Sequence, residues 1–127
     1  MFECKKILNG RGNVPEPEVH VASIPVTAGQ ALVLNGTLGS LSANTAAPTH
    51  IAMADAVSGE KVACYAVLPG MIFDVPVSED PTAIKVGDKL KLDSTTWLKV
   101  MATTGGAAIV VNTNGATKAG DIIQVKF

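Results

Sequence analysis

The stretch Lys85-Val86-Gly87-Asp88-Lys89-Leu90-Lys91-Leu92 contains the pattern that decides the fold of this chain. A glycine and an aspartate come first, and leucine then alternates with lysine. Because successive side chains of a strand point to opposite faces, the alternation predicts a β-strand with one buried face. Glycine adopts turn conformations that are closed to other residues, and a polar neighbour can hydrogen-bond the turn backbone. The stretch therefore predicts a tight turn that leads directly into a strand.

The same form occurs at two other places, TAGQALVL at residues 27–34 and KAGDIIQV at residues 118–125. The intervals between the copies are unequal, so they do not indicate a solenoid of stacked repeats. They predict three turn-into-strand units within one barrel. The alternative is that ordinary turn chemistry has recurred by chance.

Short strands separated by turn residues are predicted along most of the chain. They lie at residues 19–24, 31–35, 49–54, 61–68, 72–77, 89–93, 97–101, 107–112 and 122–127. Strands at spacings of about 8–12 residues are typical of sandwiches and barrels. We therefore predict an all-β fold, a small single-domain β-barrel or β-tulip-like sandwich at residues 19–127. Residues 1–18 are predicted to form an extended N-terminal arm and its connector.

The composition limits the possible functions. Charged residues make up 17% of the 127 residues, against about 25% in an average soluble chain. The hydrophobic fraction of 47% and the mean hydropathy of +0.33 exclude intrinsic disorder. A net charge of -1 offers no basic field for nucleic acid. Low charge on a small domain indicates a surface that is covered, and hence a protein that works in an assembly.

Neither a membrane span nor a secretory signal is predicted. The most apolar run, residues 62–73, is interrupted by Pro69-Gly70 and is shorter than a spanning helix requires. The N-terminus has no apolar stretch of the signal-peptide kind. Cys64 is expected to be a small buried hydrophobe and Cys4 to lie near the surface. We expect synthesis in a reducing cytoplasm, with both cysteines as free thiols. A disulfide between Cys4 and Cys64 is the alternative.

The N-terminal segment supports two interpretations. It combines apolar and basic residues before a stiff, proline-containing connector at residues 14–18. Such an arm could reach a neighbouring subunit. The alternative is a first edge strand followed by a loop. The candidate contact residues in this segment are Phe2, Lys5, Lys6, Ile7 and Arg11.

Residues with the spacing of a catalytic or metal site are not found. His20 and His50 each lack a second ligand at metal spacing, so both are expected to be structural or solvated. No nucleophile elbow is present, and Asp74, Glu79 and Asp80 are explained by strand and turn chemistry. The sequence therefore predicts a protein that is not an enzyme, with no cofactor and no metal ligands.

Parts of the chain resemble a known family. The segments at residues 86–93, 97–100, 107–111 and 119–127, and a central hairpin at residues 52–56 and 62–67, are similar to tailed-bacteriophage capsid cement, or head decoration, proteins. The resemblance implies a small β-barrel, often a homotrimer, on the outer surface of the virion head. There it would bridge neighbouring subunits of the major capsid protein after shell expansion. Such a protein is synthesised in the cytoplasm of a bacterial host.

Two alternatives remain beside this prediction. One is another phage structural module, such as a tail or fibre-base domain, and the other is a small cellular β-barrel that binds a soluble ligand. For capsid or subunit contact, the turn-flanked residues Met71, Ile72 and Phe73 are added to the N-terminal candidates. The alternative for these three is a strand of the core.

Overall fold

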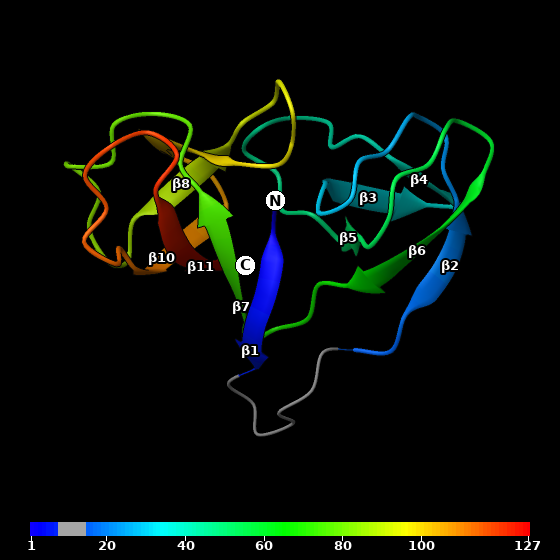
Figure 1. The fold of residues 1–127 in the computed structure, drawn as a ribbon, viewed down its shortest axis with the longest axis horizontal. Helices are drawn as coiled ribbons and strands as arrows, with labels where there is room; N and C mark the ends of the chain where they lie inside the picture. Colours follow the sequence, from blue (N-terminus) through cyan, green and yellow to red (C-terminus); the bar gives the residue numbers. More distant parts are fainter. Residues whose placement is uncertain (8–14) are drawn as a thin grey trace.

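The computed structural model describes residues 1–7 and 15–127, and within them the chain forms strands and turns without a helix. The strands form two antiparallel sheets (Figure 1). The six-stranded sheet has the order β1 (Glu3–Ile7), β7 (Met71–Pro76), β11 (Ile122–Lys126), β10 (Ala108–Asn112), β8 (Lys89–Leu92) and β9 (Val100–Thr104). In the described residues no helix is long and apolar enough to cross a membrane.

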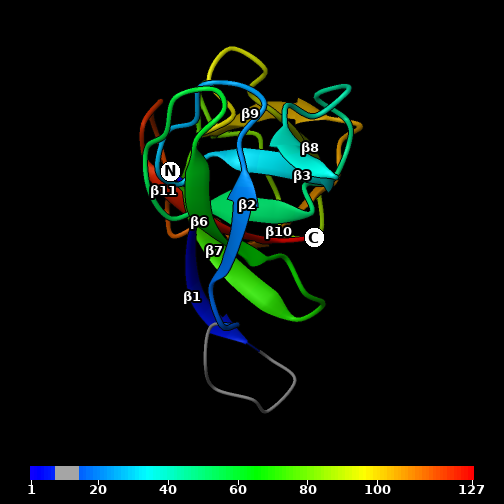
Figure 2. The same cartoon turned by 90° about the vertical axis from the view of Figure 1, so that its right-hand side faces the viewer.

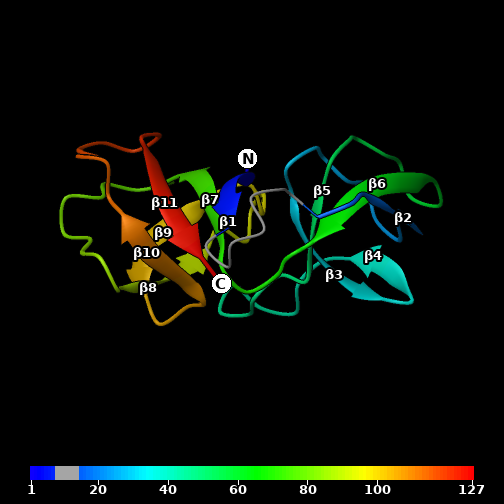
Figure 3. The same ribbon diagram turned by 90° about the horizontal axis from the view of Figure 1, so that it is seen from below.

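The five-stranded sheet contains most of the first half of the chain. Its order is β2 (Glu18–Val21), β6 (Lys61–Ala66), β5 (His50–Ala52), β3 (Ala31–Asn35) and β4 (Thr37–Gly39). Figure 2 shows this sheet facing the viewer, and Figure 3 shows the connection from β6 to β7 crossing between the two sheets. The predicted all-β fold is confirmed.

The three predicted turns have the backbone that the sequence requires. Gly29, Gly87 and Gly120 have φ values of +80°, +92° and +92°, in the left-handed region that favours glycine. The next residue is Gln30, Asp88 or Asp121, and its side chain accepts a hydrogen bond from the backbone N–H three residues earlier, at 2.9, 2.9 and 3.2 Å. Each turn then enters β3, β8 or β11. The recurrence therefore reflects one repeated local structure.

A fourth turn of this kind precedes β6. Gly59 has a φ of +90°, and the Glu60 carboxylate accepts a hydrogen bond from the Val57 N–H at 3.3 Å. Its sequence, Val57-Ser58-Gly59-Glu60, has glutamate in place of aspartate or glutamine. The turn before β6 therefore has the same local structure as the other three.

The larger apolar cluster connects the two sheets. It includes Ile51 and Tyr65 from the five-stranded sheet together with Phe73, Leu90 and Ile123 from the six-stranded sheet. A smaller cluster lies on the other face of the five-stranded sheet, where Leu32, Ala52, Val62 and Cys64 are buried. The alternation along β3, β5 and β6 divides their side chains between these two clusters.

Within residues 1–7 the chain forms β1, which is an edge strand of the six-stranded sheet and not an arm. β1 pairs antiparallel with β7, with Glu3 opposite Asp74 and Ile7 opposite Met71. Phe2 just before it is 2% exposed, with its ring centroid 6.3 Å from that of Phe73 and 5.8 Å from that of Phe127. Burial of this aromatic ring holds the segment on the sheet. The predicted arm is therefore wrong for residues 1–7, and the rest of it before Pro15 lies outside the described residues.

One strand begins later than predicted. We expected a strand at residues 97–101, whereas β9 begins at Val100. Asp93 accepts hydrogen bonds from Thr95 N–H and the Thr96 hydroxyl and, through its backbone carbonyl, from Trp97 N–H. These bonds prolong the turn, and Trp97 takes a φ of +59°. Its ring packs against the larger apolar cluster.

Candidate functional site

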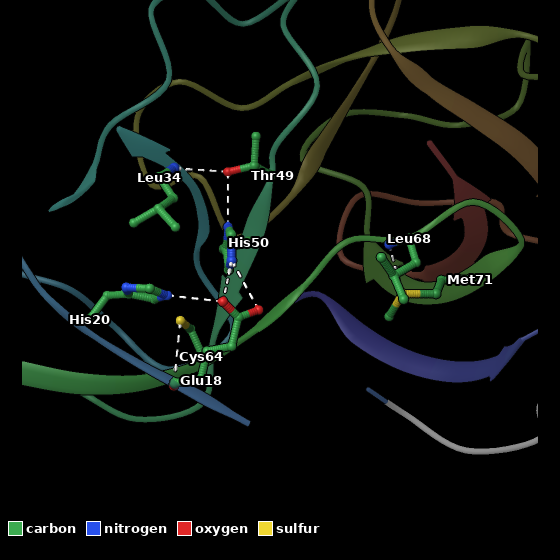
Figure 4. Close-up of polar contacts among 8 residues, drawn as sticks. All are labelled: Glu18, His20, Leu34, Thr49, His50, Cys64, Leu68 and Met71. Carbon is green, nitrogen blue, oxygen red and sulfur yellow. Dashed lines mark hydrogen bonds and ion pairs between the residues drawn. The ribbon is translucent and has the colours of Figure 1, made fainter. Parts of the chain in front are cut away.

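The predicted contact residues of β7 lie in the core. Met71, Ile72 and Phe73 are exposed by 1%, 0% and 0%. β7 lies between β1 and β11, so neighbouring strands cover both its edges. The Leu68 N–H donates to the Met71 sulfur at 3.0 Å across the Pro69-Gly70 turn (Figure 4). Prediction of these three residues as a contact surface is therefore wrong, and the core-strand alternative holds.

The predicted contact residues at the N-terminus are separated by the fold. Phe2 is buried, whereas the Lys5 side chain is exposed and forms an ion pair with Glu3 at 3.0 Å. This hydrogen bond raises the pKa of Lys5. Lys6 and Ile7 are residues of β1, and their backbones pair with β7. Arg11 lies outside the described residues. Of these five, Lys5 is the one whose described side chain is available at the surface.

A polar cluster occupies one face of the five-stranded sheet. Glu18 and His20 come from β2, His50 from β5 and Cys64 from β6. Glu18 is directly opposite Cys64, and Cys64 is opposite Ala52, two residues from His50. Paired residues and residues two apart share a face of a sheet. The register therefore gathers all four side chains, as Figure 4 shows.

The Glu18 carboxylate lies between the two imidazoles. The Nε2 of His20 is 3.0 Å from Glu18 Oε1, and the Nε2 of His50 is 3.3 Å from Oε2 and 3.4 Å from Oε1. The ring centroids are 5.7 Å apart with nearly perpendicular planes. The side chains of His50, His20 and Glu18 are 9%, 27% and 40% exposed. The cluster therefore has a buried end at β5 and an open end at β2.

Further contacts fix the buried end. His50 Nδ1 is 3.0 Å from the Thr49 hydroxyl, which accepts a hydrogen bond from the Leu34 N–H at 2.8 Å. The Cys64 thiol donates to the Glu18 carbonyl at 3.7 Å. Burial, and then the charge of Glu18, raise the pKa of Cys64 to about 11. Hydrogen bonds from His20 and His50 lower the pKa of the Glu18 carboxyl, His20 contributing most.

Three residues of this cluster have the donor atoms and proximity of a metal site. The ligand atoms of His20, His50 and Cys64 all lie within 4.8 Å of one another. From the sequence we expected no metal ligands, because neither histidine has a second ligand nearby in the chain at metal spacing. These residues come from three strands, and their proximity depends on strand pairing. The alternation along each strand shows which of its side chains share a face. It does not show which strands are neighbours.

Comparisons with known proteins relate the fold to that of a solved structure. No family model matches the chain, and no curated protein matches it. The fold is similar to the N base of the head fiber protein gp8.5 of bacteriophage phi29, with a TM-score of 0.56 and 20% sequence identity. The match covers 88% of this chain and 92% of that one. At this identity the similarity is one of fold.

Proposed function

We propose that this chain is a structural protein of a phage virion and attaches to the outside of the head. The observation that carries the proposal is the fold shared with a head fiber base over 88% of the chain. A fold alone does not assign a function, because one fold serves many. The composition and the exposed surface support the same proposal independently of the comparison.

The surface is suited to contact with other protein. Only 17% of the residues are charged, and protein–protein interfaces are depleted of Lys, Glu and Asp at their centres. Val19 and Val21 on the edge strand β2 are 61% and 37% exposed, and Val57 and Val86 are 60% and 67% exposed. Exposed apolar side chains on an edge strand and in surface turns favour association.

We propose the major capsid protein and further copies of this chain as partners. If the chain binds only the assembled, expanded shell, its binding would stabilise the shell by mass action. A homotrimer would multiply weak contacts through effective concentration and would suit a symmetry axis of the lattice. The proposal includes no nucleic-acid, membrane or cofactor role and no enzymatic activity. Sedimentation equilibrium of the purified chain measures whether it is a trimer.

The fold match also supports a second candidate, the base of a head fibre. A capsid-bridging protein contacts several shell subunits, whereas a fibre base needs to attach at one place and to hold a fibre. Both bind the head, but only bridging strengthens the seams between shell subunits. The thermal stability of the head therefore separates the two.

For a bridging protein we expect added chain to raise the temperature at which expanded heads rupture. The reason is that contacts across subunit seams must break before the shell opens. Release of packaged DNA during heating measures rupture, and unexpanded heads serve as the control. An unchanged rupture temperature with saturating bound chain would exclude bridging and favour the fibre base.

A further inference from the structure

We propose that Glu18, His20, His50 and Cys64 form a binding site for one Zn²⁺ ion. The two imidazoles, the thiolate and one carboxylate oxygen would be its four ligands. The site extends from the edge strand β2 across β6 to β5, on the face that carries the smaller apolar cluster. It does not depend on the proposed virion function.

The spacing between Glu18 and the two imidazoles already approximates that of tetrahedral ligands. Zinc bonds of about 2.0–2.1 Å to nitrogen and oxygen place tetrahedral ligand atoms about 3.3 Å apart. Glu18 Oε1 lies 3.0 Å from His20 Nε2 and 3.4 Å from His50 Nε2. The Cys64 sulfur and the imidazole nitrogens lie within 4.8 Å of one another, and zinc binding would bring them about 1 Å closer. His20 and Glu18 are partly exposed and can make that adjustment.

The donor set selects the metal. Imidazole and thiolate suit zinc and other late transition metals, whereas magnesium and calcium require mostly oxygen ligands. Zinc also accepts four-coordinate tetrahedral geometry without a redox change. Zinc would form four coordinate bonds, to the two imidazole Nε2 atoms, one Glu18 oxygen and the Cys64 sulfur, in place of the contacts between the imidazoles and Glu18. Cys64 releases its thiol proton to solvent, and each imidazole binds through an Nε2 that carries no proton, with its ring N–H at Nδ1.

The surroundings of His50 match those of a metal-bound histidine. A ligating imidazole usually donates its second ring N–H to a fixed oxygen, which orients the ring. The Thr49 hydroxyl lies 3.0 Å from His50 Nδ1 and is itself held by the Leu34 N–H. His50 Nε2 is thereby aimed at Glu18 and at the centre of the cluster (Figure 4).

Zinc would attach the edge strand to the sheet. β2 pairs with one strand of the sheet, β6, and the adjoining Ala22 forms a bridge to Leu38. Two of the ligands come from β2, one comes from β6 beside it, and one comes from β5 on the far side of β6. A metal that binds only the folded form of a chain raises the unfolding temperature of that chain. Zinc would therefore stabilise the strand whose opposite face carries the exposed Val19 and Val21.

The test is titration of the reduced, metal-free chain with Zn²⁺, and with Co²⁺ as a spectroscopic probe. We expect one equivalent to bind and to raise the unfolding temperature. Bound Co²⁺ should show a thiolate charge-transfer band together with the intense visible bands of tetrahedral coordination. An absent thiolate band, or no binding beyond that of a chelating buffer, would overturn the proposal.

Substitutions locate the site. We expect His20→Ala and Cys64→Ser to weaken zinc binding by more than the roughly 10–100-fold that loss of an outer-shell partner costs. Val21→Ala, on the opposite face of β2, and Cys4→Ser should keep the affinity and the cobalt spectrum. His20 is partly exposed, so His20→Ala tests the site even if Cys64→Ser fails to fold. Equal affinity in His20→Ala and the unmodified chain would contradict the assignment.

Discussion

Phe2→Ala is expected to lower the free energy of unfolding by about 3–5 kcal/mol, the usual cost of truncating a buried phenylalanine. Phe2 is 2% exposed and contacts the rings of Phe73 and Phe127. Its loss leaves a cavity beside β7 and releases β1 from the sheet edge. Equilibrium unfolding in urea, with the midpoint and the slope both fitted, measures the change.

Glu3→Ala is the matched control for Phe2→Ala. Glu3 lies in the same strand, but its side chain is exposed and its ion pair with Lys5 lies at the surface. Such pairs contribute about 0–1 kcal/mol. Equal stability of the two variants would show that the N-terminal segment is an arm and not a strand. The arm interpretation also predicts that deleting residues 1–13 leaves the fold intact, whereas the structure predicts a large loss of stability.

Gly106→Ala is expected to lower the free energy of unfolding by about 3 kcal/mol, at the upper end of the cost of overpacking. A Cβ atom at Gly106 would overlap the backbone of Leu90 and Lys91 in β8. Backbone held in a sheet cannot move aside as the end of a flexible side chain can. The β8–β10 pairing beside Ala108 would have to separate. Equilibrium unfolding again measures the loss.

Gly115→Ala is the control that separates overlap from backbone strain. Gly115 has a φ of +67°, and a Cβ there would meet nothing within 4 Å. Substitution by alanine therefore lowers the free energy of unfolding only by the strain of a left-handed backbone, about 1–2 kcal/mol. If Gly106→Ala is no less stable than Gly115→Ala, the β9–β10 turn does not approach the backbone of β8 as closely as the structure has it.

Local chemistry made the all-β fold and its turns predictable. The glycine and the polar residue after it determine the turn within a few residues, as at Gly87-Asp88 and Gly120-Asp121. The alternation that follows determines which side chains are buried. Both signals are contained in a short window of sequence, so one chain suffices to detect them.

The role of the N-terminal segment depended on distant residues. Phe2 could contact a neighbouring subunit or belong to the core of its own chain. Which of the two holds depends on Phe73 and Phe127, which are far away in the chain. The same holds for Met71 to Phe73, because an apolar run looks alike in a contact surface and in a buried central strand. Only the pairing of β7 with β1 and β11 separates the two.

The polar cluster also depended on distant residues. Its members come from β2, β5 and β6, and each pairing brings together residues that no local spacing connects. A search for ligands close together in the chain therefore misses His20, His50 and Cys64. Strand order is the missing information, because it determines which alternating faces meet.

Cosedimentation of the labelled chain with purified phage particles tests the proposed virion role most directly. The heads should be assembled from the capsid protein encoded in the same genome, with separated tails as the comparison. The proposal predicts saturable binding to expanded heads, with a fixed number of copies per head and no binding to tails. Binding to tails alone, or no binding to either particle, would contradict it.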